Sequence, residues 1–176
     1  MLIIICAMIP SAIILPQNDL TLDVVQLQSS WQIHGLFLAS LLCGAEIGAV
    51  CSISYLIIGL FYLPVFHGGG SIGYILTPEF GYLLGFIPSA WTCGILAKRE
   101  SNPNLINYSI YTVISLCILH LTGIFYLIAG KIFGNWINSL LDLILINTII
   151  PFPSQLLLCL SVSCLALILK HILMLK

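Results

Sequence analysis

Long apolar segments separated by short polar stretches make up almost the whole chain. The apolar segments cover residues 2–16, 31–43, 47–66, 80–97, 105–128 and 154–169. A helix needs about 20 apolar residues to cross the roughly 30 Å hydrocarbon core of a bilayer, and fewer where neighbouring helices shield it. The pattern therefore predicts an all-α integral membrane protein, a bundle of six transmembrane helices that forms one domain over residues 1–176.

The segment 136–150 differs from these six. It is apolar, but Asn138, Asp142 and Asn147 interrupt it and Pro151-Phe152-Pro153 closes it. We interpret it as a short extra helix that lies at the outer rim or re-enters the membrane before the last helix. A seventh transmembrane helix is the alternative, and it would place the C-terminus on the other side of the membrane.

The few basic residues indicate the orientation of the chain. With six transmembrane helices, four of them fall on one side, and Lys131 falls on the other. These four are Lys98, Arg99, Lys170 and Lys176. Because lysine and arginine accumulate in cytoplasmic loops, both termini are expected to be cytoplasmic. The glycine-rich loop after residue 66 then faces the outside.

Composition supports a membrane protein and excludes several other classes. Of 176 residues, 60% are hydrophobic and 6% are charged, whereas about a quarter of residues carry charge in a soluble domain. The net charge of −1 leaves no basic surface for nucleic acid. The seven cysteines form no C-x-x-C pair, and the histidines show no H-x-x-H or H-E-x-x-H spacing, so no metal site or cofactor is expected.

The stretch 60–99 carries the chain's densest cluster of glycines, which indicates an irregular, crowded site between two membrane segments. Gly69-Gly70-Ser71-Ile72-Gly73 satisfies G-x-S-x-G, and His67 opens an HGGG run such as lipases use for an oxyanion hole. One hypothesis is therefore an intramembrane serine hydrolase with Ser71 as nucleophile. Its candidate bases are weak, because His120 has no evident acidic partner and His171 falls at the opposite end of its helix.

Polar side chains at membrane depth are costly unless they are paired, so they mark candidate sites. These candidates are Glu79, Gln155, Gln32, Asn147 and Ser71. Glu79 precedes the helix over 80–97, so stabilisation of that helix start is the alternative to a binding role. Tyr82 lies one turn into the same helix beside Gly81 and Gly85, which favours an inward, ligand-facing position for it.

The first apolar segment offers one signal for interaction with another membrane helix. Ala7 and Ser11 are four residues apart and both are small. A small-xxx-small pair lets two helices approach closely, so Ala7 and Ser11 are candidate contacts with a partner helix.

The run from Leu63 to Tyr74, LPVFHGGGSIGY, followed by TPEFGYLLGF from Thr77 to Phe86, resembles the signature of the BioY family. These proteins are the biotin-specific substrate-binding subunits, or S components, of energy-coupling-factor (ECF) transporters. The resemblance implies a six-helix membrane subunit that is not an enzyme and that takes biotin from outside a bacterial plasma membrane. It further implies membrane lipids around the chain, a transmembrane scaffold subunit that docks on Ala7 and Ser11, and two ATPase subunits.

The family resemblance and the polar residues at membrane depth together give one set of candidate residues for substrate binding. They are His67, Gly69, Gly70, Ser71, Glu79, Tyr82 and Gln155. An S component for a different vitamin remains an alternative to biotin, beside the serine hydrolase.

The chain departs from the family pattern at two places. The family usually reads Gly-Pro-Thr-Gly-Gly-Tyr where this chain has TPEFGY, so Glu79 and Phe80 are its own. In the last helix the family tends to have an acidic residue and a lysine, near the positions of Gln155 and Leu158. Without the lysine, the biotin carboxylate needs other donors, for which backbone N–H groups of residues 68–71, His67 and Lys131 are candidates.

Overall fold

The structure is a computed structural model that describes residues 2–16, 22–66, 69–99, 104–137 and 139–173, with the backbone alone at 2, 8, 10–16 and 22–30. Its long helices are α2 (Gln32–Cys43), α3 (Ala45–Phe61), α5 (Phe86–Lys98), α6 (Leu105–Ile132) and α8 (Phe152–Ile172). Shorter elements are α1 (Leu2–Met8), α4 (Phe80–Leu84), α7 (Leu140–Ile144), the 3-10 turn η1 (Ile72–Leu76) and the π-helical turn η2 (Leu145–Ile149).

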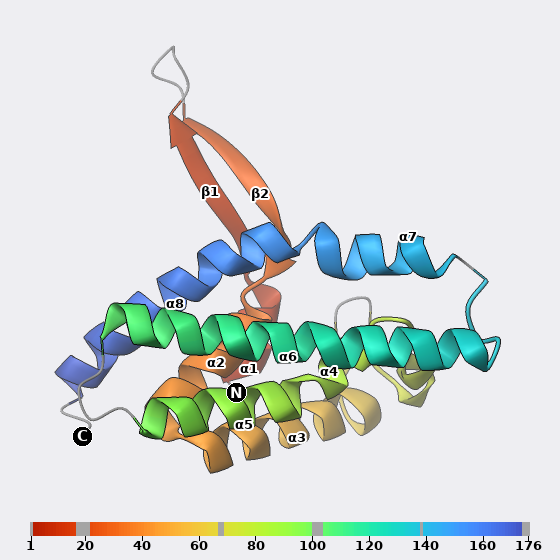
Figure 1. Cartoon of the computed structure of the whole chain (residues 1–176), viewed down its shortest axis with the longest axis horizontal. Coiled ribbons are helices and arrows are strands. Elements are labelled where there is room, and N and C mark those ends of the chain that lie inside the picture. The colour runs from red at the N-terminus through yellow and green to blue at the C-terminus, as the bar shows by residue number, and fades with distance from the viewer. Residues whose placement is uncertain (1, 17–21, 67–68, 100–103, 138, 174–176) are drawn as a thin grey trace.

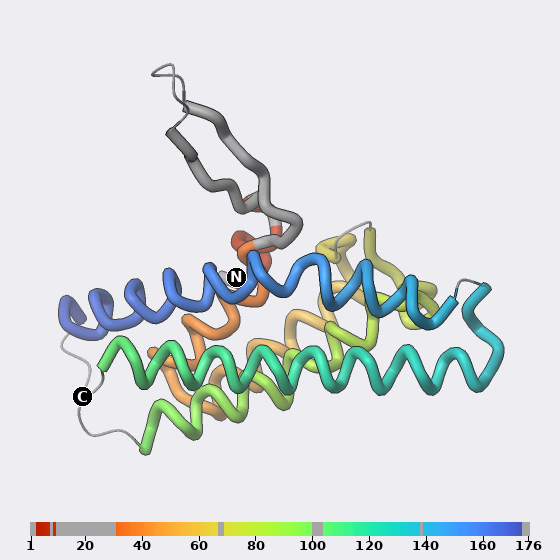
Figure 2. Tube along the Cα trace, turned by 45° about the horizontal axis from the view of Figure 1, so that its top comes forward, coloured from red at the N-terminus to blue at the C-terminus, as the bar shows by residue number. Residues whose placement is uncertain are grey.

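The helices form an elongated bundle around α6, the longest of them (Figure 1). Helix α6 packs against α5 and α4 on one side and against α8 on the other. Helix α2 contacts α3, α5 and α8, and so joins the two halves of the bundle. The chain from α7 through η2 to α8 runs along the length of α6 (Figure 2). The bundle therefore brings α2, α4, α6 and the start of α8 together near its middle.

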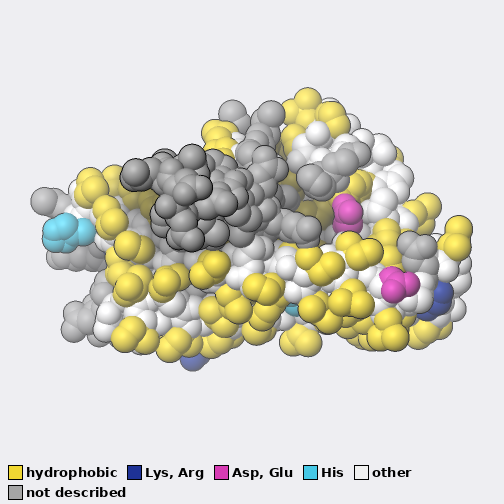
Figure 3. Space-filling view, turned by 90° about the horizontal axis from the view of Figure 1, so that it is seen from above, with side chains coloured by type: hydrophobic (Ala, Val, Ile, Leu, Met, Phe, Trp, Pro, Cys, Tyr) yellow, Lys and Arg dark blue, Asp and Glu magenta, His cyan; other side chains and the backbone are white. Residues whose placement is uncertain are grey.

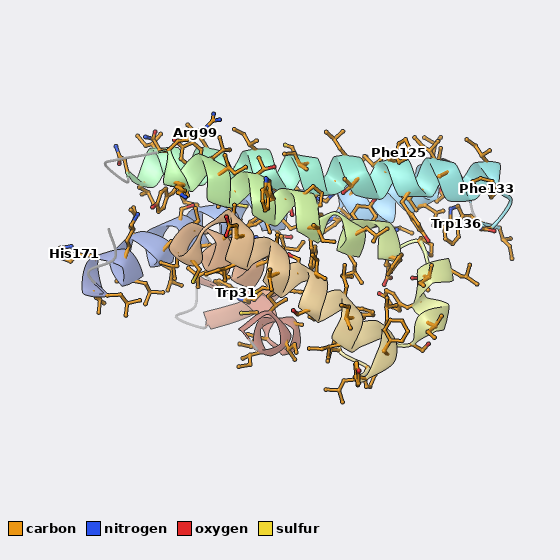
Figure 4. All side chains as sticks on the ribbon, turned by 90° about the horizontal axis from the view of Figure 1, so that it is seen from below. Trp31, Arg99, Phe125, Phe133, Trp136 and His171 are labelled. Atoms are coloured by element: carbon orange, nitrogen blue, oxygen red, sulfur yellow. The ribbon has the colours of Figure 1, made fainter. Side chains whose placement is uncertain are left out.

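The surface of this bundle is largely apolar. Figure 3 shows hydrophobic side chains across one face, with few charged groups among them. Phe125 and Phe133 on the α6 side are 75% and 80% exposed and point away from the bundle (Figure 4). Such an exposed apolar surface suits a lipid environment and would be unusual in water.

Three helical runs are long and apolar enough to cross a membrane. They are Phe80–Lys98, Leu105–Ile132 and Leu140–Ile172, and α2 and α3 are shorter apolar helices. Five of the six predicted transmembrane helices thus occur as helices at their predicted places. The start of the fourth is interrupted at Gly85, between α4 and α5.

The helix predicted over 2–16 is wrong beyond Met8. Residues Pro10–Pro16 form strand β1, which pairs antiparallel with β2 (Leu22–Ser30) and projects from the bundle (Figure 1). Pro10 has no N–H to continue α1, and it disfavours helical geometry at the residue before it. In the hairpin, the β-branched Ile13 pairs with Val25, and such residues favour strands.

The hairpin also removes the proposed small-residue pair in the first helix. Ala7 is half-buried in α1, whereas Ser11 belongs to β1 and its side chain is outside the description. The two residues therefore do not lie one turn apart on a helix, and the predicted close-packing motif is not formed as such.

The described basic residues separate toward the ends of the bundle as predicted. Arg99 and His171 lie at one end, and Trp136 lies near the other (Figure 4). Lys131 belongs to this second end, where its Nζ donates a hydrogen bond to the Trp136 carbonyl oxygen at 3.1 Å. Lys176 lies outside the described residues.

The predicted outer segment is helical and continues into the last helix. Residues Leu140–Ile172 form one helical run that changes direction at the π-helical turn η2 and Pro151. Pro151 and Pro153 lack the N–H groups of a regular helix, and a π-turn likewise interrupts the regular pattern. The prediction of a short extra helix before the last one is therefore confirmed as secondary structure.

Candidate substrate-binding site

A cavity of about 220 Å³ lies where α2, η1, α4, α6, η2 and the start of α8 meet. Its walls combine apolar side chains with a few polar groups, which is typical of a site for a small organic ligand. The lining residues are Gln32, Ile33, Tyr74, Glu79, Tyr82, Leu83, Phe86, Leu119, His120, Ile146, Asn147, Pro151 and Gln155. Three of the predicted site residues, Glu79, Tyr82 and Gln155, meet here.

Gln155 is the centre of a buried polar cluster on the α8 side of the cavity. Its side-chain Oε1 accepts a hydrogen bond from His120 Nε2 at 2.7 Å, and its backbone oxygen accepts one from His34 Nε2 at 3.1 Å. Because oxygen acts only as an acceptor in both bonds, each imidazole carries its proton on Nε2. Gln155 is 6% exposed, so its side chain is buried within the bundle and does not lie at the surface.

This arrangement leaves two groups of opposite character at the cavity wall. His120 Nδ1 is buried within the wall and has no hydrogen-bond partner among the described residues, so a ligand reaches its lone pair only if the imidazole shifts. The Gln155 Nε2 group is a donor that makes no hydrogen bond within the described chain. An acceptor and a donor thus lie side by side on α6 and α8.

Two further amides line the cavity with their oxygens uncommitted. Gln32 Nε2 donates to the Tyr55 hydroxyl at 2.9 Å, and Tyr55 in turn donates to the Val65 carbonyl oxygen at 2.9 Å. Asn147 Nδ2 donates to the Leu143 carbonyl oxygen at 2.9 Å. In both amides the NH₂ group is engaged, so the oxygen is the atom available to a ligand.

Tyr82 is fixed in the wall by a glycine opposite it. A Cβ on Gly123 of α6 would lie 2.4 Å from Cδ1 and Cε1 of the Tyr82 ring, so only glycine lets the ring occupy this place. The Tyr82 hydroxyl lies 2.6 Å from the Thr148 hydroxyl in η2. Tyr82 therefore bridges α4 and η2 across the cavity, which agrees with the predicted inward position.

Glu79 lies at the exposed side of the cavity and does not cap α4 through its side chain. Its Oε2 accepts a hydrogen bond of 2.6 Å from the hydroxyl of Tyr74 in η1. Burial raises the pKa of Tyr74, and the bond to Glu79 raises it further, so the phenol keeps its proton and remains the donor. Glu79 is therefore the N-cap residue of α4 by position, but its carboxylate bonds to Tyr74 and not to the N–H groups at the helix start.

The glycine-rich loop itself has a different position from the one predicted. Gly69, Gly70 and Ser71 do not belong to the lining of the cavity. Gly70 packs against backbone instead, because a Cβ there would lie 2.6 Å from the Gly59 carbonyl oxygen and from Pro64 Cα. The loop thus packs at Gly70 against the backbone of Gly59 and Pro64 and does not line the cavity. His67 lies outside the described residues.

The geometry gives no support to a serine hydrolase. Ser71 is exposed, and the candidate base His120 is buried in the cavity wall with its Nε2 bonded to Gln155. His171 lies at the far end of the bundle (Figure 4). Within the described residues, no group of three or more His, Cys, Asp and Glu side chains is arranged to hold a metal ion.

Several lining residues were only partly anticipated. Gln32 and Asn147 belong to the polar residues at membrane depth, but the sequence could not show that they face Gln155. The sequence offers His120 as a weak catalytic base or as a buried histidine paired with a neighbouring oxygen, and it does not assign Tyr74 to the site. The sequence feature that could have identified His120 is the same one that identified Gln155, because a polar side chain inside an apolar membrane segment is costly unless it is paired.

A comparison with protein families matches the BioY family over residues 1–174. Among curated relatives, the chain is 36% identical over 107 residues to a "Probable biotin transporter BioY" of Lysinibacillus sphaericus, covering 61% of this chain and 54% of that protein. It is 31% identical over 99 residues to the "Biotin transporter BioY" of Thermotoga maritima, covering 54% and 56%. These matches therefore span about half the length of either relative.

A relative of another origin and a solved structure extend the comparison. The chain is 30% identical over 145 residues, 82% of its length and 74% of the relative's, to an uncharacterized 21.2 kDa protein of Cyanophora paradoxa. It matches the crystal structure of the S-component for biotin from an ECF-type ABC transporter with a TM-score of 0.72 and 20% identity, over 96% of this chain and 85% of that one. The last match shows a shared fold.

Proposed function

Because the chain belongs to the BioY family, we propose that it is the substrate-binding subunit of an energy-coupling-factor transporter and that it binds biotin in the cavity around Gln155. The printed names of its relatives and the S-component fold support biotin uptake. The observation that carries the assignment to this cavity is the buried His120–Gln155 pair. In this pair, Gln155 Nε2 is a donor at the cavity, and His120 Nδ1 is an acceptor without a described partner that lies buried within the wall.

These groups complement the ureido ring of biotin, which has two N–H donors and one carbonyl acceptor. His120 Nδ1 and the oxygen of Gln32 or Asn147 supply acceptors for the two N–H groups, and Gln155 Nε2 supplies the donor for the carbonyl. A ligand that satisfies buried polar groups gains affinity, and a ligand that leaves them unpaired loses it. The cavity thus favours a cyclic urea over a ring without this pattern.

The rest of the cavity suits the sulfur-containing ring and the aliphatic chain of biotin. Apolar side chains from five elements make up this part, and they are Ile33, Leu83, Phe86, Leu119 and Ile146. Burial of the apolar part of the ligand contributes about 25 cal/mol for each Å² removed from water. The proposed orientation places the ureido ring at Gln155 and the valerate chain toward η1.

The carboxylate of biotin then reaches the exposed side of the cavity near Glu79. Leu158, at the position where the family tends to have lysine, is buried and does not line the cavity. Lys131 donates a hydrogen bond to the Trp136 carbonyl oxygen, so we do not propose it as the donor to the biotin carboxylate. We propose that the N–H groups of Gly70 and Ser71, with His67, receive the carboxylate, which must then extend beyond the cavity because neither Gly70 nor Ser71 lines it.

The proposal includes partners that supply energy. A substrate-binding subunit of this family and fold is not an enzyme, and the chain has the form of a multi-pass membrane protein. We propose that a transmembrane scaffold subunit and two ATPase subunits drive transport, and that the scaffold docks at α1, where Ala7 is half-buried and Ile5 is 58% exposed. We place the chain in a plasma membrane with both termini in the cytoplasm.

Equilibrium binding of radiolabelled biotin to the purified chain tests the proposal. Saturable binding of biotin is expected, and an excess of thiamine or riboflavin should not displace the label. Displacement by either of these vitamins would favour an S component for a different substrate. No saturable binding of biotin, in a sample that shows cooperative thermal unfolding, would contradict the proposal.

Glu79 provides a test of the proposed orientation of the ligand. Its carboxylate is at the exposed side of the cavity, where it repels the negatively charged end of biotin. Glu79→Gln should therefore raise the affinity for biotin about threefold, a modest effect because the site is exposed. The affinity for biotinamide, which is uncharged at this end, should not change. An equal change for the two ligands would show that the valerate end lies elsewhere.

A further inference from the structure

A second, larger cavity lies at the opposite end of the bundle from Trp136. It has a volume of about 590 Å³ and lies between the turn that joins α2 to α3, the last turns of α5 and the end of α8. This is the end at which Arg99 and His171 are found (Figure 4). None of the residues that line the proposed biotin cavity lines this one.

Positive charge predominates in the lining of this second cavity. Lys98, Arg99 and Lys170 line it, and Glu46 is the one carboxylate among its described lining residues. Of the four lysines and arginines in the described residues, three line this cavity. Such a concentration attracts an anion.

Lys170 provides an independent reason to expect an anion. It is half-buried, and its described partner is neutral, because Nζ donates to the Tyr108 hydroxyl at 3.2 Å and lies 6.0 Å from the centre of the Tyr108 ring. Tyr108 is fully buried, so it fixes the ammonium group in place. An anion bound in the cavity would supply the counter-charge that Lys170 does not have among the described residues.

Apolar side chains also line the cavity, and it is partly open to the surroundings. Trp91 and Ile47 line it and are 46% and 51% exposed, and Ile95 lines it as well. The cavity lies where two membrane-length helical runs, Phe80–Lys98 and Leu140–Ile172, reach the basic end. A ligand that fills it should therefore combine an anionic group with hydrocarbon. Basic pockets between membrane helices bind anionic lipid head groups in this way.

We propose that this cavity binds an anionic phospholipid, with the phosphate group between Lys98, Arg99 and Lys170 and with acyl chain contact at Trp91 and Ile47. The proposal does not depend on the identity of the transported substrate.

Native mass spectrometry of the detergent-purified full chain tests this site. The chain is mixed with equal amounts of phosphatidylglycerol and phosphatidylcholine, and the ratio of the two bound lipids is measured. Wild type should retain phosphatidylglycerol preferentially. Lys170→Gln should lower the ratio about fivefold, and the triple replacement of Lys98, Arg99 and Lys170 by glutamine should lower it about a hundredfold.

Lys131→Gln is the matched control, since it removes the same charge at the other end of the bundle, and it should leave the ratio unchanged. Lys98→Gln with Arg99→Gln covers the case in which the Lys170 variant fails to fold, because both side chains are exposed. Equal retention of the two lipids by wild type, or an equal effect of Lys131→Gln, would overturn the proposal. Release of the lipid by millimolar inorganic phosphate would also overturn it, by showing a site for the free anion.

Biotin binding provides a separate reading of the same variants. Because the two cavities share no lining residue, the lysine and arginine variants should bind biotin as wild type does. Loss of lipid preference with intact biotin binding supports the lipid site. Failure of wild type to bind biotin, with lipid preference intact, would count against the proposed transport function alone.

Discussion

Replacing Gln155 by leucine is expected to lower the affinity for biotin about a hundredfold, the largest loss for any single side chain of the cavity. The substitution removes the Nε2 donor and also the Oε1 that accepts the hydrogen bond of His120 at 2.7 Å. The His120 Nε2–H is then buried without a partner, and the imidazole loses the contact that fixes its proton on this atom. Radiolabelled biotin binding to the purified variant measures the effect.

Ser161→Leu is the matched control for this variant. It places a leucine on the same helix, α8, at an exposed position outside the cavity, and it should leave biotin binding unchanged. Thermal unfolding of both variants in detergent separates lost binding from lost folding. A folded Gln155→Leu variant with wild-type affinity would show that biotin is not recognised by this cluster.

Gly123→Ala is expected to weaken biotin binding about tenfold although Gly123 does not line the cavity. The added methyl group would lie 2.4 Å from the Tyr82 ring, so the ring must move. Its hydroxyl then leaves Thr148, and the bridge between α4 and η2 is lost. Phe125→Ala on the exposed side of α6 is the control, with binding as in wild type.

A double-mutant cycle shows whether this effect passes through Tyr82. In a Tyr82→Ala background there is no ring to displace, so Gly123→Ala should have no further effect on affinity. Additive losses in the double variant would show instead that the methyl group acts through a general change in α6 packing, and would contradict a positioning role for Gly123.

The helical framework was predictable because apolar run length directly reports membrane helices. The segments 31–43, 47–66, 105–128 and 154–169 all correspond to helices within a few residues. The prediction of a helix over 2–16 was wrong beyond Met8 because an apolar run of this length can form either a helix or a strand. What decides it is the placement of Pro10 and the later run Leu22–Ser30, which pairs with it, and pairing partners are not visible in a single apolar run.

The candidate site was predictable in part, for a related reason. Gln155 and Glu79 are polar residues in apolar surroundings, and Tyr82 lies beside glycines, so each carried a local signal. Gln32 and Asn147 carried the same signal, but their position opposite Gln155 depends on how α2 and η2 pack. The glycines of the loop carried the strongest local signal, yet Gly70 is required by a backbone contact with residue 59.

The central feature of the proposed biotin complex is a ureido ring that lies between His120 and Gln155. An experimental structure of the chain with biotin bound measures this directly. The predicted result is a ureido N–H within hydrogen-bond distance of His120 Nδ1 and the ureido oxygen within hydrogen-bond distance of Gln155 Nε2. Biotin bound with its ureido ring away from both side chains would contradict this placement of the ligand.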